Sequence, residues 1–199
     1  MIVVAITGGI ASGKSFCISV FRERGFKCIS ADIIAHEIAN TTIAREKIES
    51  AFGTGYYVDN TLDRKKLGKF VFADKTRLEK LNSIMHKLIY DRMQELIKEY
   101  SASEKLIAIE IPLLYETNMQ GIADCVINCW VPEEVQLERL LQRDGISSDE
   151  AKARMNSQLP TETKKALADY NVDSRMSFED TRVYVNNLIN IILNEEING

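Results

Sequence analysis

The chain has 199 residues, enough for one hydrophobic core or for one domain with an inserted subdomain. Its hydrophobic content of 45% and charged content of 27% are ordinary for a soluble globular protein, and its net charge of −4 argues against a general binder of nucleic acid or membrane surfaces. No run of the sequence reaches the apolar length that a membrane-spanning helix needs.

The first predicted element is a buried strand over residues 2–6, and a glycine-rich segment follows it directly. Residues 8–15 fit the phosphate-loop pattern of Gly, four free positions, Gly, Lys and Ser. The next apolar residues have the spacing of one helix face: Phe16, Cys17, Val20 and Phe21. Strand, glycine turn and helix in this order predict a nucleotide-phosphate site. The alternative is a turn that merely joins the strand to the helix.

Each part of this loop has a predicted role. Gly8 and Gly13 let the backbone approach a ligand without a clashing Cβ atom, and the loop amides form an anion cradle with the helix N-terminus. Lys14 is expected to reach the β- and γ-phosphates, Ser15 to ligate Mg²⁺, and the amide of Phe16 to meet the α-phosphate. The full predicted ATP-binding set is Gly8, Gly9, Ile10, Ala11, Ser12, Gly13, Lys14, Ser15 and Phe16.

The chain begins with this strand and loop, so we expect no signal peptide and a cytoplasmic location. The four cysteines do not form a metal-binding pattern. Cys125 and Cys129 fall four residues apart on a predicted strand, a span of about 13 Å, which is too long for two ligands of one zinc ion. Buried free thiols are therefore expected.

Further strands are predicted at 27–30, at 106–111 before Pro112 and at 125–131 before Pro132. Helical patterns separate these strands, which indicates right-handed crossovers and a parallel sheet. Acidic residues directly after Pro132 favour a helix start. In the last helix, an apolar stripe is expected to pack against the sheet without a functional role: Phe178, Thr181, Val185, Leu188 and Ile192.

A long insertion, about residues 32–103, separates the second and third of these strands. It reads as helices at 32–40, 43–52, 63–72 and 75–100, with loops at 53–55 and 59–60. An all-helical insertion beside a phosphate loop suits a substrate-holding subdomain, although the periodicity fits a purely structural element equally well.

A second helical insertion follows Arg143 and suggests a lid. Ser147 or Ser148 is suited to cap its first helix, and Pro160 interrupts it. Arg154, Lys164 and Lys165 lie within it, which predicts a basic lid on an acidic protein.

Asp32 stands at the end of the second strand, where ligands of open parallel sheets gather. A carboxylate there can accept the proton of an attacking hydroxyl or hold Mg²⁺ through water. The alternative is a helix N-cap for residues 33–40, and both roles can hold at once.

Arg139 and Arg143 are one helical turn apart, so both can face the same way. Arginine forks stabilise the charge that develops on a phosphoryl group during transfer. The alternative is a solvated helix face with salt bridges to Glu133, Glu138 and Glu150.

His36 and His86 are the two histidines of the chain, and neither has a metal-ligand spacing, so substrate contact is their candidate role. His36 follows Asp32 by four residues and is a candidate for the same cleft. Trp130, at a strand end, is more readily explained as core than as a base-stacking platform.

Several segments together resemble dephospho-CoA kinases. The similarity includes a Thr-Gly-Gly-Ile lead-in to the phosphate loop, the segment around Asp32, a Pro-Leu-Leu-x-Glu segment and a lid pattern. The matching segments are 7–15, 30–37, 81–86, 111–116, 139–144, 150–158 and 164–169, within a stretch from residue 2 to about 174. The chain departs from the family at Ser30 (Asp in the family), Lys87 (Pro) and Ser174, where an Asn usually serves the adenine.

The resemblance implies an α/β, three-layer P-loop kinase fold in one domain over 1–199. This fold has a parallel sheet of about five strands, a helical substrate-binding insertion (33–103) and a helical lid (144–168). The implied reaction is ATP-dependent phosphorylation of the ribose 3′-hydroxyl of dephospho-CoA, with Mg²⁺ as the cofactor. The implied partners are ATP and dephospho-CoA, without nucleic acid or membrane, and no particular oligomeric state is predicted.

The residues expected to carry this reaction follow from the same match. Asp32, Lys14, Arg139 and Arg143 are the catalytic candidates. The substrate-binding candidates are Thr7, Asp32, His36, His86 and Leu113. Ser15 is the Mg²⁺ ligand, with Asp32 acting through water.

Two other functions remain as alternatives. Another small-molecule kinase, for a nucleoside or nucleotide, would share the same loop. A nucleotide-driven switch is less favoured, because the sequence contains no Asn-Lys-x-Asp guanine-reading motif and its third predicted strand ends at Ile111-Pro112 without a metal-binding Asp.

Overall fold

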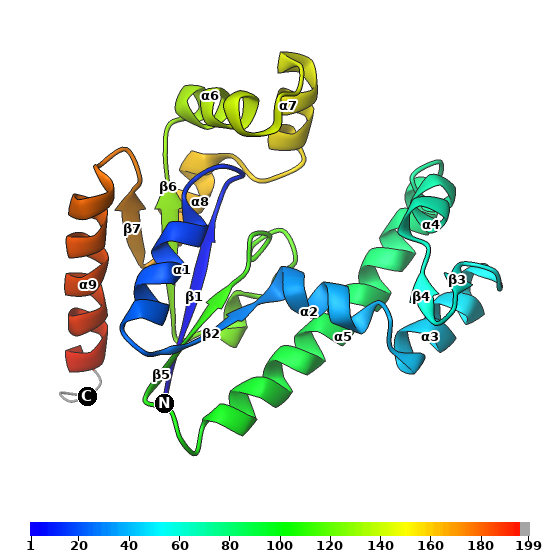
Figure 1. Cartoon of the computed structure of the whole chain (residues 1–199), viewed down its shortest axis with the longest axis horizontal. Helices are drawn as coiled ribbons and strands as arrows, with labels where there is room; N and C mark the ends of the chain where they lie inside the picture. The colour runs from blue at the N-terminus through cyan, green and yellow to red at the C-terminus, as the bar shows by residue number, and fades with distance from the viewer. Residues whose placement is uncertain (196–199) are drawn as a thin grey trace. The chain divides into compact units, whose positions relative to one another are not determined.

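A parallel β-sheet of five strands, in the order β2-β5-β1-β6-β7, organises the computed structural model, which describes residues 1–195 (Figure 1). All neighbouring strands in this sheet run parallel. The strands are β1 (Ile2–Gly8), β2 (Lys27–Ser30), β5 (Leu106–Glu110), β6 (Cys125–Trp130) and β7 (Tyr170–Asp173). The prediction of a P-loop kinase fold with about five parallel strands is confirmed, although the sequence pattern predicts no strand at β7.

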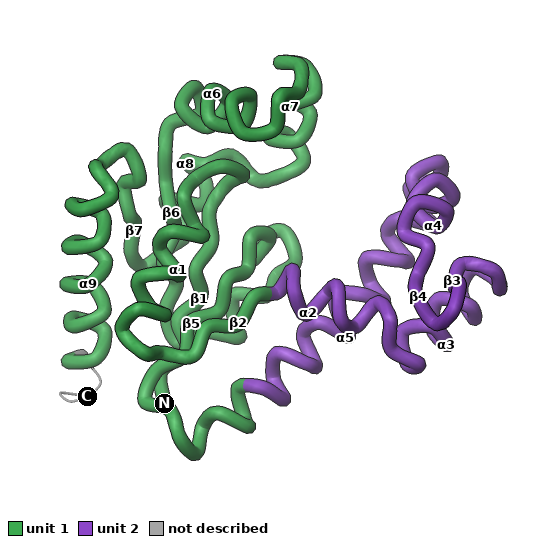
Figure 2. Tube along the Cα trace, viewed as in Figure 1, with its two compact units in different colours: residues 1–30, 97–199 green, residues 31–96 purple. Residues whose placement is uncertain are grey.

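The chain divides into two units (Figure 2). Unit 1 consists of residues 1–30 and 97 onward and contains the sheet, and unit 2 consists of residues 31–96. The last four residues of the domain expected over 1–199 lie outside the described residues.

Strand β1 is buried along its whole length because β5 and β6 flank it and helices cover the sheet. A strand buried on both faces needs a continuous apolar run rather than an alternating one, which explains the sequence Ile-Val-Val-Ala-Ile at its start. In the β1–β6 register Gly8 pairs with Cys129, so the strand ends where the glycine-rich segment begins.

One face of the sheet packs against helices α1 (Lys14–Glu23) and α9 (Phe178–Glu195), which also contact each other. Alternate residues of the strands supply this core, as the period of two requires. They are Ile2, Val4, Ile6, Leu106, Ala108, Ile127, Cys129 and Val172. In α9 the predicted stripe is buried at Thr181, Val185, Leu188 and Ile192, but Phe178 at its start is exposed.

The remaining helices of unit 1 follow β5 and β6. They are the 3₁₀ turn η1 (Gln120–Ile122), α6 (Glu133–Asp144), α7 (Ser148–Asn156) and α8 (Thr161–Leu167). Helix α6 begins directly after Pro132 with two acidic residues in its first turn, as predicted. Ser147 is the N-cap of α7 and accepts a hydrogen bond from the Glu150 amide at 3.2 Å.

Unit 2 has a core of its own. Its elements are α2 (Ala31–Ile38), α3 (Thr42–Phe52), β3 (Tyr57–Val58), β4 (Thr61–Leu62), α4 (Arg64–Val71) and most of α5 (Lys75–Tyr100). Ile48, Tyr56, Leu67 and Val71 are buried together.

The prediction of an all-helical insertion is wrong at one place, because β3 and β4 form a small antiparallel hairpin. Asp59 and Asn60 connect them with φ angles of 47° and 63°. Asp and Asn tolerate this left-handed conformation, and two such residues in succession make the turn that matches the twist of a hairpin. Strands of two residues are too short to show a hydrophobic period.

All four cysteines are free thiols, with Cys17 and Cys129 buried and Cys28 and Cys125 half-buried. Within the described part of the chain, every helix is too short or too polar to cross a lipid bilayer.

The burial of α9 predicts the effects of two matched substitutions. Ile189 is fully buried and Ile191 is 47% exposed. We expect Ile189→Ala to lower the free energy of unfolding by about 2–5 kcal/mol, because it leaves a cavity in the core, and Ile191→Ala to change it by less than about 1 kcal/mol. Urea titrations followed by the fluorescence of Trp130, the one tryptophan of the chain, measure both values. Equal losses in the two variants would contradict this packing.

Candidate active site

The junction between β1 and α1 has the backbone geometry of an anion cradle. Gly8 has a φ of 147°, and a Cβ atom built on it would lie 2.4 Å from the carbonyl oxygen of Cys129. Gly13 is the N-cap residue of α1 with a φ of 94°. Both positions therefore require glycine, and between them the loop crosses from the sheet to the helix.

The start of α1 forms the helical side of this cradle. The amides of Phe16 and Cys17 donate to the carbonyl oxygen of Gly13, at 3.1 and 3.2 Å, so the predicted contact of the Phe16 amide with an α-phosphate requires it to leave this acceptor. The amides at the start of any helix lack acceptors within that helix, and the helix dipole makes the same end favourable for negative charge. Ser15 lies in this first turn with its side chain exposed.

The side chain of Lys14 lies against the loop. Its Nζ atom donates to the carbonyl oxygens of Gly8 and Gly9, at 3.1 and 2.8 Å. The ammonium group thus lies against the same turn whose amides form the cradle. This is the arrangement expected of a lysine that neutralises a bound polyphosphate.

The middle of the loop has a strained backbone, and hydrogen bonds restrain it. Ala11 has a φ of 59°, a left-handed conformation that is unfavourable for a residue with a Cβ atom. The neighbouring amide of Ile10 donates to Oε1 of Gln158 at 2.8 Å, and the amide of Ser12 donates to the carbonyl of Gly9 at 3.3 Å. Gln158 lies within the segments of family resemblance, but nothing local to it predicts a contact with a residue near the N-terminus.

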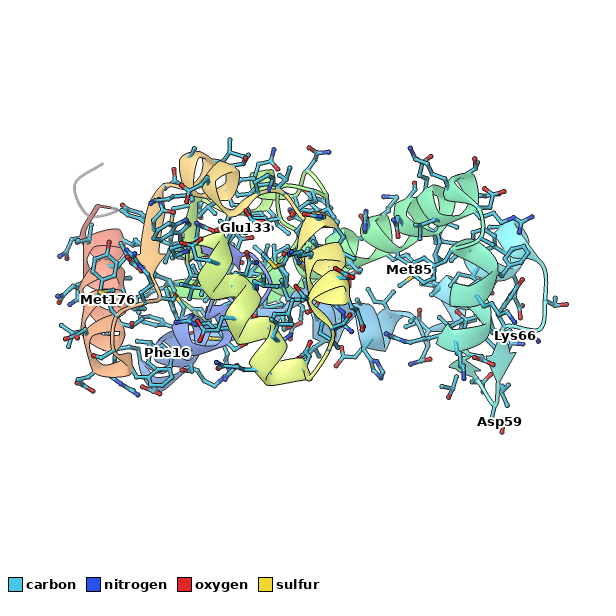
Figure 3. All side chains as sticks on the ribbon, turned by 90° about the horizontal axis from the view of Figure 1, so that it is seen from above. Phe16, Asp59, Lys66, Met85, Glu133 and Met176 are labelled. Atoms are coloured by element: carbon cyan, nitrogen blue, oxygen red, sulfur yellow. The ribbon has the colours of Figure 1, made fainter. Side chains whose placement is uncertain are left out.

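A cavity of about 420 Å³ opens beside the loop, within unit 1. It is lined by Ala11, Gly13, Phe16, Arg139, Ser174, Met176, Ser177, Phe178 and Thr181, of which Figure 3 labels Phe16 and Met176. The rings of Phe16 and Phe178 lie 5.0 Å apart between their centroids. Phe178 is 76% exposed, so the expectation that it only packs against the sheet is wrong: the stripe begins one turn later, and Phe178 borders the cavity.

Arg139 and Arg143 make different contacts although they are one turn apart. Nη2 of Arg139 donates to the carbonyl oxygen of Ser174 at 2.6 Å and faces the cavity. Arg143 donates through Nε and Nη2 to the carboxylate of Asp144, at 2.7 and 3.1 Å. This hydrogen bonding lowers the pKa of Asp144 and raises that of Arg143.

The other cations of the predicted lid do not form one basic surface. Arg154 bonds to Asp144 at 2.9 Å and to Glu150 at 2.8 Å, so Glu150, one of the partners in the salt-bridge alternative, pairs here with Arg154. Lys164 is fully buried and pairs with Glu116 at 2.8 Å, so the expectation that it contributes to a basic lid is wrong. A cation buried with a carboxylate offers no charge to solvent.

Lys165 stacks on Trp130, with Nζ 3.6 Å from the ring centroid, and the indole Nε1 donates to Glu162 at 2.8 Å. Trp130 is buried, in agreement with its interpretation as core.

The predicted substrate-binding residues fall in both units. Thr7 is buried at the end of β1, and its hydroxyl donates to the carbonyl of Pro112 at 3.4 Å. Leu113 follows β5 and is partly exposed. Both belong to unit 1, together with the phosphate loop.

Asp32, His36 and His86 belong to unit 2. Asp32 is exposed and lies inside the first turn of α2, because this helix begins at Ala31; the alternative of an N-cap for residues 33–40 therefore does not hold. His36 is exposed on the same helix. His86 is half-buried on α5, and burial lowers its pKa.

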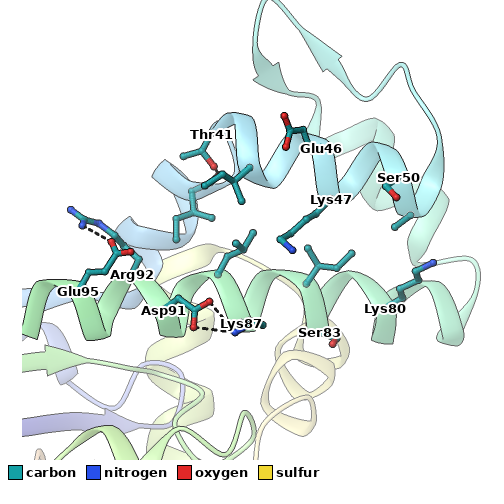
Figure 4. Close-up of a pocket in the computed structure, with 15 residues that line it drawn as sticks. Thr41, Glu46, Lys47, Ser50, Lys80, Ser83, Lys87, Asp91, Arg92 and Glu95 are labelled. Carbon is teal, nitrogen blue, oxygen red and sulfur yellow. Dashed lines mark hydrogen bonds and ion pairs between the residues drawn. The ribbon is translucent and has the colours of Figure 1, made fainter.

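Unit 2 also carries a groove of its own, of about 800 Å³, between α3 and α5 (Figure 4). Its lining includes the apolar residues Ile43, Ile84 and Leu88 and the basic residues Lys47 and Lys80. Lys87, which departs from the family pattern, pairs across one turn with Asp91 at 3.1 Å.

The residues present fit a Mg²⁺ ion held mainly by a nucleotide. Within residues 1–195 no group of three or more His, Cys, Asp or Glu side chains is placed to hold a metal ion. Mg²⁺ commonly binds through one or two protein oxygens together with substrate phosphates and water, so the exposed hydroxyl of Ser15 at the cradle suits such an ion.

Comparison with known proteins gives a consistent result. The family model described as dephospho-CoA kinase matches residues 2–180. A dephospho-CoA kinase of Carboxydothermus hydrogenoformans is 42% identical over 183 residues, which cover 90% of this chain and 89% of that protein. A dephospho-CoA kinase of Bacillus licheniformis is 37% identical over 201 residues, which cover 98% of each.

Among solved structures, the dephospho-CoA kinase from Campylobacter jejuni superimposes with a TM-score of 0.75 at 31% sequence identity. The match covers 98% of this chain and 98% of that one. The similarity therefore extends over both the sheet and the insertion.

Gly8 offers a direct test of the loop. We expect Gly8→Ala to abolish ATP binding and to lower the free energy of unfolding by about 1–3 kcal/mol, because the added methyl group meets the backbone of β6. Calorimetric titration with ATP and thermal melting measure the two effects. Gly121→Ala is the matched control, since a Cβ atom there has no neighbour within 4 Å. Normal ATP affinity in the Gly8 variant would rule out this loop as the nucleotide site.

Proposed function

The chain belongs to the dephospho-CoA kinase family, and from this premise we propose which of its residues carry out each part of the reaction. The resemblance seen in the sequence is confirmed. The enzyme phosphorylates dephospho-CoA with ATP to give coenzyme A and ADP. The family match favours this reaction over phosphorylation of a nucleoside or nucleotide. The observation that carries the proposal is the β1–α1 junction, where glycine-enforced backbone, helix N-terminus and Lys14 meet at one turn.

ATP is proposed to bind with its phosphates on residues 8–16 and its adenine in the adjoining cavity. Lys14 exchanges its carbonyl partners Gly8 and Gly9 for the β- and γ-phosphates. The rings of Phe16 and Phe178 border the cavity and offer flat surfaces to a purine. Ser174 also lines this cavity, at the position where the resemblance noted in the sequence implies an Asn, so the side chain proposed to meet the base is smaller here.

The acceptor is proposed to react at its ribose 3′-hydroxyl with Asp32 as the general base. Asp32 follows the carboxyl end of β2 by two residues and is exposed, as proton transfer to its carboxylate requires. Unit 2 is proposed to hold the pantetheine-bearing substrate, and its groove between α3 and α5 supports that assignment. Thr7, His36, His86 and Leu113 are proposed substrate contacts.

Arg139 and Arg143 are proposed to stabilise the charge on the transferred group. Arg139 already lines the nucleotide cavity. Arg143 has to exchange Asp144 for a phosphate oxygen, which an exposed and solvent-screened ion pair permits at little cost. Closure of the lid would exclude water and so suppress hydrolysis of ATP.

Mg²⁺ is proposed as the cofactor, held by the Ser15 hydroxyl and the nucleotide, with Asp32 contributing through water. When bound, the ion neutralises negative charge on the β- and γ-phosphates. We also propose a cytoplasmic site of action, which the four free thiols support, because a reducing compartment keeps cysteines in that state.

The reaction is tested by mass spectrometry of the products. After incubation with Mg-ATP and dephospho-CoA, we expect one added phosphate on the acceptor, located on the ribose 3′-oxygen by fragmentation. Nucleosides and nucleoside monophosphates serve as the comparison acceptors. Faster turnover of a nucleotide acceptor than of dephospho-CoA would favour the alternative kinase.

Asp32 is tested by an isosteric change. We expect Asp32→Asn to lower kcat by at least about 100-fold, because an amide cannot take the proton, while the Kd for ATP stays the same. Asp59→Asn, at an exposed turn of the same unit, is the matched control and should keep full activity. Wild-type turnover by the Asp32 variant would remove this residue from the role of base.

A further inference from the structure

The side chain of Lys164 is fully buried, although lysine carries a charge. Its Nζ atom donates to Oε1 of Glu116 at 2.8 Å and to the carbonyl of Pro112 at 2.8 Å. A buried ion pair seldom adds stability over a well-packed apolar pair, because both charges lose their hydration. Such a pair can instead fix geometry, because the hydrogen bonds between the two charged groups hold the segments that carry them in one arrangement.

Glu116 fixes the chain at the entry to α8. The same oxygen, Oε1, accepts a hydrogen bond from the amide of Leu159 at 2.8 Å. One carboxylate therefore joins the segment after β5 both to the amide of Leu159, before α8, and to Lys164 within that helix. All of these residues belong to unit 1.

Gln158, the residue before Leu159, reaches the phosphate loop. Its Oε1 accepts the amide proton of Ile10 at 2.8 Å, directly beside Ala11 with its left-handed backbone. A strained backbone persists only where its surroundings hold it in place. The hydrogen bond from Gln158 is such a restraint, and its position depends on where Glu116 holds Leu159.

We propose that Glu116 is a positioning residue for ATP binding. By fixing Leu159 it sets Gln158 against Ile10, and Gln158 keeps the strained loop in the shape that receives the triphosphate. The proposal rests on the proposed function in one respect, namely that the loop binds the phosphates of ATP. It assigns a role to the glutamate of the Pro-Leu-Leu-x-Glu segment that is separate from substrate contact.

The experiment measures the Kd for Mg-ATP by calorimetry without acceptor, together with the KM for dephospho-CoA and kcat at saturating ATP. We expect Gln158→Ala to raise the Kd for ATP about fivefold to tenfold, the size of effect of one lost hydrogen bond, with the KM for dephospho-CoA unchanged. Ile189→Ala is the control for general destabilisation and should leave the Kd for ATP unchanged.

Glu116 is tested in a Lys164→Met background, so that no variant leaves an unpaired buried charge. Glu116→Ala/Lys164→Met should raise the Kd for ATP as much as Gln158→Ala does. Glu116→Gln/Lys164→Met should restore it, because the amide oxygen can still accept from Leu159. Adding Gln158→Ala to the Glu116→Ala/Lys164→Met variant should produce no further increase, since both changes break one chain of contacts.

Several results would overturn the proposal. These are an unchanged Kd in the Gln158 variant, effects of the two sites that multiply in the combined variant, or an equal loss of ATP affinity in Ile189→Ala. A wild-type enzyme that binds ATP but does not phosphorylate dephospho-CoA would instead refute the proposed function and leave the ATP-affinity comparison valid.

Discussion

The close approach of β1 and β6 at Gly8 is the constraint on which the site depends. The carbonyl oxygen of Cys129 lies only 2.4 Å from where a Cβ atom of residue 8 would be, so the strands reach this separation only because position 8 has no side chain. The same parallel register brings β1 to its end at this point, and the chain then turns into α1. Buried neighbours on both sides of β1 hold that end rigidly. The backbone of the loop that follows Gly8 therefore begins at a position fixed by the sheet.

The ion pairs in this part of unit 1 differ in how far they are exposed to solvent. Arg143 and Arg154 keep their carboxylate partners at the surface, where such pairs are weak and easily exchanged. Lys164 is fully buried and the side chain of Glu116 is only 16% exposed, so separating this pair is costly and its arrangement is correspondingly firm. Arg143, which is proposed to meet a phosphate, thus has an easily exchanged partner, whereas the Lys164–Glu116 pair, which joins two backbone segments, does not exchange readily.

The two units build their cores independently. Unit 1 buries apolar residues between the sheet and the pair α1 and α9, and unit 2 buries a smaller set around Ile48 and Leu67. Each unit has its own concave surface, the cavity beside the phosphate loop in one and the groove between α3 and α5 in the other. Two independent cores support the proposed division of the two substrates between the units, because each unit can keep its own concave surface without repacking the other.

Short sequence patterns were enough to predict the phosphate loop, the parallel sheet, the starts of α6 and α7, and the family. The loop, the sheet and the helix starts each depend on residues within a few positions of one another: apolar runs, glycine and lysine at fixed spacing, and capping residues. The family was indicated by several such short motifs spread along the chain. The hairpin at Asp59 and Asn60 escaped prediction because its strands are too short to show a period. Only the tertiary structure showed that Gln158 braces Ile10, 148 residues away, that Lys164 is buried against Glu116, and that Phe178 borders a cavity. Such contacts depend on how distant elements pack, and a lysine or glutamine has the same local pattern whether it meets solvent or a partner.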